Sequence, residues 1–548
     1  MGMIRSLILA LALAGPAAAG EARFDWFDYR GEAPPAAPAG QFRNPVLTGF
    51  YPDPTSLRVG DDYYLVTSTF SYFPGLPVFR SRDLVSWEQI GNAIDRPGQL
   101  DFSGLGLSRG VFAPDMTWRD GTFYILNTCV DCGGNYLITA KDPAGPWSDP
   151  VWIREVDGID PAFFFDDDGR AYLLNNGPPE GTPLYEGHRA IWMQEFDLKA
   201  LKPVGPRRVL VNGGVDLSKK PIWIEGPHIY LKDGWYYLTC AEGGTSEQHS
   251  QVVLRSRDVW GPYQPYAGNP ILTQRHLPGD RPNPITSAGH ADLLETPAGE
   301  WWATFLATRP YAGDFYNTGR ETFLLPVTWK DGWPVILEGD AAIPAVLPRP
   351  KLPAGRGPAP DAYRDEFDAP ALGPAWMTIR TPKSRWHRLD GGALTLQARN
   401  VPLGSLGQPS YFGRRQQHMR AEAATRVAFT PSGEGDRAGL AALQSEDFFY
   451  LLSLARDGGR TIVKLERRAG KGQAPHGVTL AAAPAPDGRP VELKIVARGD
   501  RYDFLYAVEP GRWTMLHAGA DGTILSTKTA GGFVGVTFGL YAYSEETP

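Results

Sequence analysis

The sequence has few cysteines, few long hydrophobic runs and no large excess of one charge. Its 548 residues include only Cys129, Cys132 and Cys240, which are too few for a disulfide framework. Beyond the N-terminus, no segment approaches the roughly 20 apolar residues that a membrane-spanning helix needs. The 54 basic and 61 acidic residues are interspersed and give a net charge of -7, so no concentrated basic face is expected for nucleic acid. We therefore expect neither a membrane partner nor a nucleic-acid partner.

The first 20 residues are typical of a secretory signal peptide. Arg5 precedes an apolar stretch at 7–14, and small residues at 17–19 offer a cleavage site. We expect residues 1–20 to be removed and the mature protein to be secreted or periplasmic. That compartment would permit a Cys129–Cys132 disulfide, which the sequence alone leaves open.

The chain is rich in glycine, proline and aromatic residues. Aromatics make up 12% of it, with 63 Gly and 50 Pro, which is typical of many short strands joined by tight turns. Aromatic rings are also what a sugar site needs, because they cover the apolar faces of a pyranose. Most of these rings are nevertheless expected to lie in the core.

A repeated phrase divides the first 340 residues. Five times a short polar or glycine-containing turn precedes an aromatic-rich strand. The five copies begin at Gly60, Asp120, Asp168, Asp233 and Ala298. Strands of four to seven residues with this spacing are typical of four-stranded propeller blades. We therefore predict a five-bladed β-propeller over residues 41–340.

The pattern changes after the repeats. Residues 341–362 are rich in proline and predict a stiff, extended linker. Residues 363–548 contain longer alternating strands separated by glycine-containing turns, and they predict a β-sandwich. The expected fold class is all-β, with a five-bladed propeller followed by a sandwich.

Three acidic residues stand out by their local sequence. Asp53 lies between two prolines, Asp160 precedes an apolar strand, and Glu225 lies among apolar neighbours at a strand end. A propeller directs one end of each inner strand to its central tunnel, so these side chains are expected to meet there. Partial burial would raise the pKa of Glu225, as a general acid requires. Hydrolysis of a glycosidic bond needs such a set of carboxylates.

Several ordered motifs strengthen this hypothesis. They are the stretch 44–54, the tripeptides at 68–70, 73–75 and 113–115, Glu225-Gly226-Pro227-His228 and Ala241-Glu242-Gly243-Gly244-Thr245. Together they closely resemble family 43 glycoside hydrolases, and most of all the two-domain branch of β-xylosidases and α-L-arabinofuranosidases. The resemblance covers the propeller, the linker and the sandwich.

The resemblance implies an inverting mechanism with three assigned roles. Asp53 is implied as general base, Glu225 as general acid, and Asp160 as the carboxylate that raises the pKa of the acid and orients it. Inversion needs room for a water molecule, so the base and the acid are expected to be roughly 6.5–9.5 Å apart.

Further site residues follow from the same resemblance. Phe70 and Phe112 are implied to line the sugar pocket, and His249 and Arg320 to contact the terminal sugar. His290 matches a tunnel histidine associated with a bound ion or water, which allows a Ca²⁺ ion there, whereas no organic cofactor is implied. In one respect the chain departs from the family pattern. Residues 527–530, which precede the strand at 531–535, contain no aromatic ring that could reach the pocket.

The preferred function is an exo-acting hydrolase that releases terminal xylosyl units from xylo-oligosaccharides, with release of α-L-arabinofuranosyl units from arabino-oligosaccharides as a second expected activity. Three alternatives stay open: a non-catalytic carbohydrate-binding propeller, an endo-arabinanase-type hydrolase, and a retaining enzyme acting on sucrose or fructans. The sequence does not indicate an oligomeric state.

Overall fold

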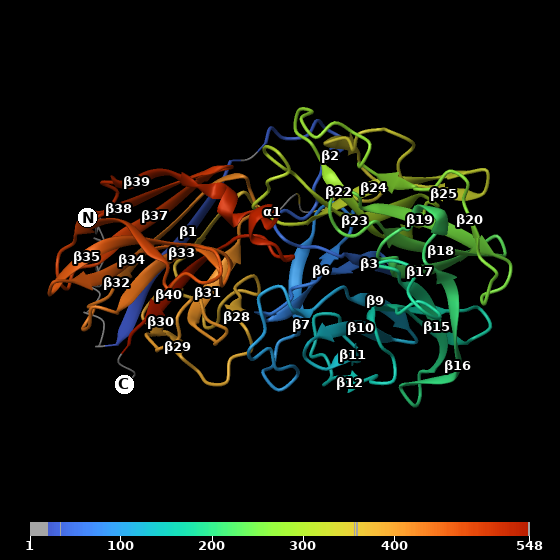
Figure 1. The fold of residues 1–548 in the computed structure, drawn as a ribbon, viewed down its shortest axis with the longest axis horizontal. Coiled ribbons are helices and arrows are strands. Elements are labelled where there is room, and N and C mark those ends of the chain that lie inside the picture. The colour runs from blue at the N-terminus through green and yellow to red at the C-terminus, as the bar shows by residue number, and fades with distance from the viewer. Residues whose placement is uncertain (1–19, 33, 356, 358–359, 546–548) are drawn as a thin grey trace, which may run out of the picture.

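The computed structural model describes residues 20–545 except 33, 356 and 358–359. Nearly all of its regular structure is β-strand, in a propeller and a sandwich that lie side by side (Figure 1). The predicted all-β fold class is therefore confirmed. Apart from Gly20, the predicted signal peptide lies outside the described residues. Among the described residues, no helix is long and apolar enough to cross a bilayer.

Five antiparallel sheets form the propeller. The first contains β3 (Thr55–Val59), β4 (Asp62–Val66), β6 (Gly75–Ser81) and β7 (Glu88–Ile94). The second contains β8 (Gly110–Val111), β9 (Asp115–Arg119), β10 (Thr122–Val130), β11 (Gly134–Ala140) and β12 (Val151–Trp152). The third contains β13 (Ile159–Phe165), β14 (Ala171–Gly177), β15 (Ala190–Asp197) and β16 (Lys202–Asn212).

The last two sheets follow the same plan. The fourth contains β17 (Glu225–Lys232), β18 (Trp235–Glu242), β19 (Ser250–Ser256), β20 (Gln264–Pro265) and β21 (Leu272–Thr273), with the short 3-10 helix η1 (Leu217–Lys219) before it. The fifth contains β22 (Thr286–Glu295), β23 (Trp301–Thr308), β24 (Glu321–Lys330) and β25 (Trp333–Val335).

The inner strands of the five sheets close into a ring. Each contacts the next, in the order β3, β9, β13, β17, β22 and back to β3. Each inner strand also pairs with the strand that follows it in its own blade. That second strand is the aromatic-rich strand of the sequence repeat. The ring brings the beginnings of five strands that are distant in sequence to one end of the propeller.

The turns of the repeat have the geometry expected for tight hairpins. Asp120 and Gly121 both have positive φ (50° and 73°), as do Asp233 and Gly234 (53° and 71°). Positive φ at both central residues is the requirement of a type I′ turn, which matches the twist of the flanking strands. The Asp-Gly pairs are therefore placed where the backbone needs them.

The segment before the first blade packs against the propeller. β2 (Gln41–Arg43) pairs with β26 (Val346–Pro348), which belongs to the Pro-rich segment predicted as a linker. Asn44 fixes the same region to blade five, because its amide donates to Leu324 O at 2.8 Å and accepts from Leu324 N at 2.9 Å. This part of the Pro-rich segment thus packs on the propeller.

Two sheets face each other in the sandwich. One contains, in order, β29 (His387–Leu389), β30 (Leu394–Gln397), β1 (Glu21–Gly31), β32 (Arg420–Ala428), β37 (Val491–Arg498), β38 (Arg501–Ala507) and β39 (Thr514–Asp521), with β27 (Ala362–Asp365) beside β1. The other contains β31 (Ser410–Arg415), β40 (Thr537–Tyr543), β33 (Arg437–Ser445), β34 (Phe448–Asp457), β35 (Arg460–Ala469) and β36 (Val478–Pro484). The short helices η2 (Gly522–Leu525) and α1 (Thr527–Ala530) precede β40.

Strand β1 was not anticipated from the sequence. It runs through the middle of the first sandwich sheet. The described part of the chain therefore begins in the sandwich, forms the propeller and then returns to the sandwich (Figure 1). Ala22 and Phe24 are fully buried, and Phe27 and Tyr29 are buried further along the strand. The pairing register shifts between Phe24 and Trp26, which marks a β-bulge. The sandwich core therefore depends on both ends of the chain.

The two domains are joined by a short sheet and a buried arginine. β5 (Tyr72–Phe73) of the propeller pairs with β28 (Thr378–Ile379). Next to β28, Arg380 is 1% exposed, donates to Leu105 O at 2.5 Å and to Gly407 O at 2.6 Å, and forms an ion pair with Glu446. Its guanidinium thus connects a propeller loop to two parts of the sandwich.

We expect Arg380→Ala to destabilise the protein strongly, because it leaves Glu446 and two carbonyls without their partner. Breaking a buried pair typically costs about 3–5 kcal/mol, which corresponds to a fall of about 5 °C or more in the apparent melting temperature. Differential scanning calorimetry measures this. Arg388→Ala is the matched control, because it removes a partly exposed ion pair with Glu21 of a kind worth at most about 1 kcal/mol. Equal shifts in the two variants would contradict the bridging role of Arg380.

Candidate active site

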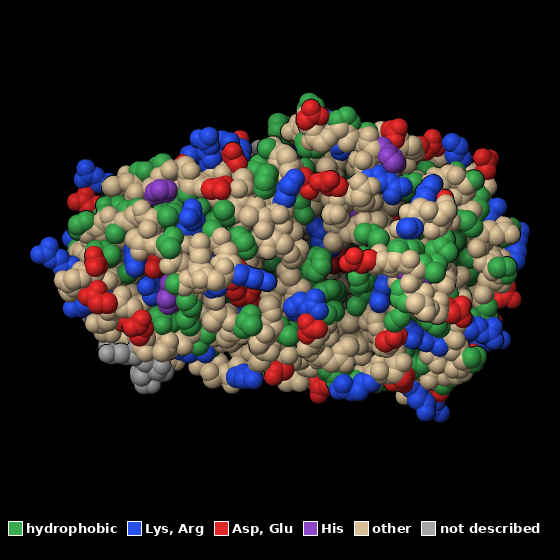
Figure 2. Space-filling model, viewed as in Figure 1, with side chains coloured by type: hydrophobic (Ala, Val, Ile, Leu, Met, Phe, Trp, Pro, Cys, Tyr) green, Lys and Arg blue, Asp and Glu red, His purple; other side chains and the backbone are tan. Residues whose placement is uncertain are grey.

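Three carboxylates line one cavity at the end of the ring. Asp53 lies just before β3, Asp160 is the second residue of β13, and Glu225 is the first residue of β17. The cavity has a volume of about 410 Å³, and all three side chains belong to its wall. Figure 2 shows the surface hollowed near the middle of this face, with charged and hydrophobic side chains around the hollow. The carboxylates predicted from sequence are therefore brought together.

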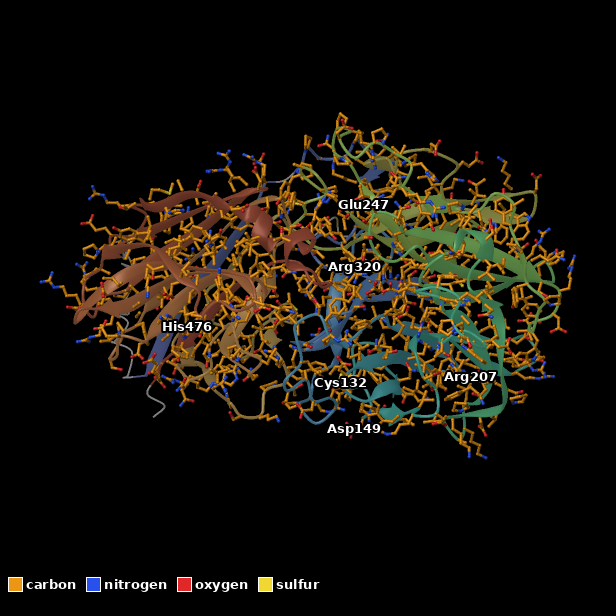
Figure 3. All side chains as sticks on the ribbon, in the orientation of Figure 1. Cys132, Asp149, Arg207, Glu247, Arg320 and His476 are labelled. Atoms are coloured by element: carbon orange, nitrogen blue, oxygen red, sulfur yellow. A yellow bond between two sulfur atoms is a disulfide. The ribbon has the colours of Figure 1, made fainter. Side chains whose placement is uncertain are left out.

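Asp53 is held as an anion by its neighbours. Ser68 Oγ donates to its Oδ2 at 2.5 Å, and Arg320 Nη1 donates to its Oδ1 at 3.0 Å. Burial alone raises the pKa of Asp53, but the Arg320 charge and the Ser68 hydrogen bond outweigh it, so the pKa lies below its usual value. Figure 3 shows Arg320 near the middle of the molecule, where the propeller meets the sandwich. A carboxylate in this state can accept a proton from water.

Glu225 has the opposite electrostatic environment. Burial and the negative charges of Asp160 and Asp53 raise its pKa well above the usual value. Burial and the charge of Asp53 also raise the pKa of Asp160 to about 7, although the Gly226 N–H donates to Asp160 Oδ2 at 3.1 Å. A carboxyl group with a raised pKa favours its protonated form, which a general acid needs.

The backbone of the cavity wall is strained at five residues. Asp53, Phe70, Asp160, Trp223 and His290 all have φ between 52° and 57°. Residues other than glycine rarely adopt this region, and such outliers cluster at functional sites, where the surrounding structure enforces them. The fold therefore directs these side chains into the cavity at a cost in backbone energy.

An aromatic cluster forms one side of the cavity. The predicted pocket residues Phe70 and Phe112 meet edge to face with centroids 5.6 Å apart, and Phe533 of the sandwich stacks on Phe70 at 5.8 Å and 22°. The Phe533 N–H donates to Ser108 Oγ at 2.8 Å, which fixes the sandwich segment at the pocket. Residues 527–530 contain no aromatic ring, as the sequence indicated, but the sandwich still supplies one. The ring comes from residue 533 and not from residues 527–530.

The two predicted histidines differ in position. His290 lines the cavity, with Nδ1 3.9 Å from Asp53 Oδ1. His249 is buried behind the wall, where its Nδ1 lies 2.9 Å from Ser287 O and its ring packs against Gly289. Of the predicted sugar contacts, His249 is the one that the structure does not place at the cavity surface.

The surroundings of His290 do not resemble a calcium site. Ca²⁺ takes six to eight oxygen ligands, whereas the described part of the chain contains no group of three or more His, Cys, Asp or Glu side chains arranged to hold a metal. On the other side, a Cβ at Gly226 would lie 2.7 Å from His290 Nε2. His290 is therefore packed tightly between Asp53 and the glycine after Glu225.

Some residues of the wall were missed by the sequence analysis. They include Arg109, Trp223, Thr245 and Ser246. Thr245 lies in one of the family motifs, so its position at the site could have been predicted from the sequence. Its hydroxyl accepts a hydrogen bond from Arg320 at 2.8 Å. Arg109 and Trp223 lie in loops with no distinctive local pattern, and only the folded chain reveals them.

The CxxC pair lies close to this wall. Cys129 and Cys132 form a disulfide at the tip between β10 and β11. Between them, Asp131 accepts from Arg109 Nε at 2.7 Å. Cys240 is free and buried.

Comparison with known families agrees with the two-domain architecture. The model of glycosyl hydrolases family 43 matches residues 42–334, and that of the beta xylosidase C-terminal concanavalin A-like domain matches residues 364–548. Each of the two domains is therefore matched by its own family model.

Whole-chain relatives give the same result. A xylosidase/arabinosidase of Butyrivibrio fibrisolvens is 38% identical over 91% of this chain and 95% of its own length. A non-reducing end alpha-L-arabinofuranosidase of Bacteroides ovatus is 36% identical over 91% of each chain.

Solved structures extend the likeness to the fold. The structure of a GH43_12 protein retrieved from a capybara gut metagenome is 38% identical and superposes with a TM-score of 0.88, over 96% of this chain and all of that one. A xylan beta-1,4-xylosidase from Bacillus halodurans is 33% identical with a TM-score of 0.83, over 92% and 96% of the two chains. Matches of this extent, together with three carboxylates in one cavity, show that this chain is a glycoside hydrolase and belongs to glycosyl hydrolases family 43.

Proposed function

We propose that this enzyme is an inverting exo-glycosidase that releases terminal β-D-xylosyl units, and also α-L-arabinofuranosyl units, from hemicellulose oligosaccharides. One observation supports it most: a carboxylate with a lowered pKa, Asp53, and a carboxyl with a strongly raised pKa, Glu225, face the same cavity. Environments that separate the pKa values of two carboxyl groups in this way assign the base and the acid.

The proposed reaction is a single displacement. Asp53 removes a proton from a water molecule, and the water oxygen forms a bond to the anomeric carbon from the face opposite the leaving group. Glu225 gives its proton to the glycosidic oxygen as the bond to the anomeric carbon breaks. The products are a sugar of inverted anomeric configuration and a shortened chain with a new hydroxyl group. The proposal requires the two carboxyl groups to be roughly 6.5–9.5 Å apart.

Asp160 is proposed to act through Glu225. Its charge is one of the causes that raise the pKa of Glu225, and its hydrogen bond to the Gly226 N–H fixes it beside the acid. It is therefore a positioning residue that also keeps the acid protonated.

The closed side of the cavity favours removal of terminal sugars. Arg320, Phe70 and Phe533 make contact with one another there, with the Arg320 guanidinium 5.9 Å and 5.3 Å from the two ring centroids. An oligosaccharide could not continue through this wall, so the terminal sugar would bind with its non-reducing end against it. The relatives named above include both xylosidases and arabinofuranosidases, which supports the proposed pair of sugars.

Export is proposed on the N-terminal sequence. Residues 1–20 have the pattern of a signal peptide, and a disulfide such as Cys129–Cys132 persists mainly in oxidising compartments. The proposed location is the periplasm or the medium, where hemicellulose oligosaccharides are accessible.

Product analysis tests the function. We expect the purified enzyme to release monosaccharides from xylobiose, xylotriose and arabinofuranosyl-substituted oligosaccharides, and proton NMR to show the inverted anomer first. A retained anomer would indicate a retaining enzyme, and internal cleavage of arabinan an endo-acting one. Sugar binding without any release would indicate a binding module.

The roles of Asp53 and Glu225 can be separated by leaving-group ability. We expect Glu225→Gln to lower kcat/KM for xylobiose by about 10²–10⁴-fold, but much less for 2,4-dinitrophenyl β-xyloside, whose leaving group needs no proton. Asp53→Asn should impair both substrates alike, because both need an activated water. Steady-state kinetics measures this, and circular dichroism checks folding.

A surface carboxylate serves as control for the same experiment. Asp149→Asn alters a side chain that is 82% exposed and far from the cavity (Figure 3), so we expect wild-type rates. The role assignment fails if Glu225→Gln loses the same factor on both substrates.

The pH profile tests the role of Asp160. Asp53 must be ionised, so activity falls as the pH drops through its lowered pKa; Glu225 must be protonated, so activity falls as the pH rises through its raised pKa. Asp160→Asn removes one cause of that raised pKa, so the alkaline limb of kcat/KM should move to lower pH while the acid limb changes less. An alkaline limb that does not move would contradict electrostatic coupling between Asp160 and Glu225.

A further inference from the structure

An exposed tryptophan lies at the wall of the catalytic cavity on the side of Glu225. Trp223 lines the cavity together with Ile159, Asp160 and Glu225, yet 39% of its surface is exposed. Large exposed rings are uncommon because their burial is favourable. The mechanism proposed above gives this ring no role.

The backbone holds Trp223 in an unfavourable conformation. Its φ is 53°, which costs energy for a bulky residue. Its N–H donates to Gly187 O at 2.9 Å, and the neighbouring Ile222 O accepts from Gly243 N at 2.9 Å. Bonds to blade three on one side and to blade four on the other therefore enforce the position of the ring.

A cation supports the ring. The Arg189 guanidinium carbon lies 5.0 Å from the centroid of Trp223, within the range of a cation–π contact. Trp223 lines the cavity, whereas Arg189 is not among the lining residues. The guanidinium covers one face of the indole, and the partial exposure of the ring leaves room for a ligand on the other.

One buried amide links this support to the catalytic strand. Asn176 is fully buried; its Oδ1 accepts from Arg189 Nε at 3.0 Å and Nη2 at 2.8 Å, and its Nδ2 donates to Ile224 O at 2.6 Å. Ile224 is the residue between Trp223 and Glu225. The ring, the cation behind it and the backbone next to the acid thus form one rigid unit.

From this unit we infer that Trp223 is the stacking platform for the leaving-group sugar. Glu225 must protonate the glycosidic oxygen, so the sugar beyond that oxygen lies on the side of Glu225, where the free face of Trp223 is found. A flat indole that covers the apolar face of a sugar and is fixed in place loses little entropy on binding. Trp223 therefore determines specificity for the leaving group, whereas Arg320, Phe70 and Phe533 hold the terminal sugar. This inference rests on the proposed exo-glycosidase function.

The test compares two substrates that share the terminal sugar. Xylobiose has a sugar as leaving group, and β-xylosyl fluoride has an ion that is too small to reach the platform. We expect Trp223→Ala to lower the ratio of kcat/KM for xylobiose to kcat/KM for the fluoride about tenfold, corresponding to the loss of one stacked ring. Trp223→Phe should restore most of this ratio, because a smaller aromatic face remains.

A matched control is available on another blade. Trp118 in β9 is 40% exposed and is not part of the cavity wall, so Trp118→Ala should keep the wild-type ratio. An unchanged ratio in Trp223→Ala would overturn the inference. If both substrates lost the same factor, the ratio would be unchanged and the role of Trp223 would be purely structural. A wild-type enzyme that cleaves neither substrate would instead refute the proposed function itself.

Discussion

The ring of inner strands decides which residues of this chain can meet. Each blade contributes the beginning of one strand to the same end of the propeller, and the contacts return from β22 to β3. Asp53, Asp160 and Glu225, which are separated by more than 60 residues from one another, share a cavity only because this ring is closed. If blade one, three or four were displaced, the site would lose one of its carboxylates and also a charge that influences the pKa values of the other two.

Burial gives these carboxyl groups their different properties. In a medium of low dielectric constant a charge interacts strongly with its neighbours and is costly without a partner. Asp53 has Arg320 and Ser68 as partners and stays ionised. Within the described chain Glu225 forms no ion pair, and burial and two other acids outweigh the pKa-lowering charges of Arg320 and Arg189. The same burial therefore produces a base and an acid from similar groups, because only one of them is paired with a cation.

The sandwich is part of the catalytic cavity and not only an appended domain. Phe533 completes the aromatic cluster at the cavity, and Arg380 and the β5–β28 pair connect the two domains. Because β1 belongs to the sandwich, the propeller is inserted between two parts of the sandwich sequence. Both domains must therefore be in place before the site is complete.

Much of this could be read from local sequence. Periodic Asp-Gly turns and aromatic strands indicated the blades, because a hairpin turn and a strand are set by neighbouring residues. Local sequence and the family resemblance indicated a set of residues that all lie at the cavity: Asp53, Asp160, Glu225, Phe70, Phe112 and Arg320. The sequence did not reveal that β1 lies in the sandwich, since an alternating strand carries no information about which strand it will pair with.

Other features were decided only by the tertiary structure. Phe533 reaches the pocket, His249 lies behind its wall, and Trp223 is presented on the side of the acid, although nothing in their local sequences distinguishes these outcomes. The reason is physical: a side chain's conformational preferences and hydrophobicity are local and can be read residue by residue, whereas its distance to a group hundreds of positions away depends on how sheets and domains pack. The sequence by itself determined the strands, the turns and the set of reactive groups; the packing of five blades and a sandwich determined which of those groups face one another.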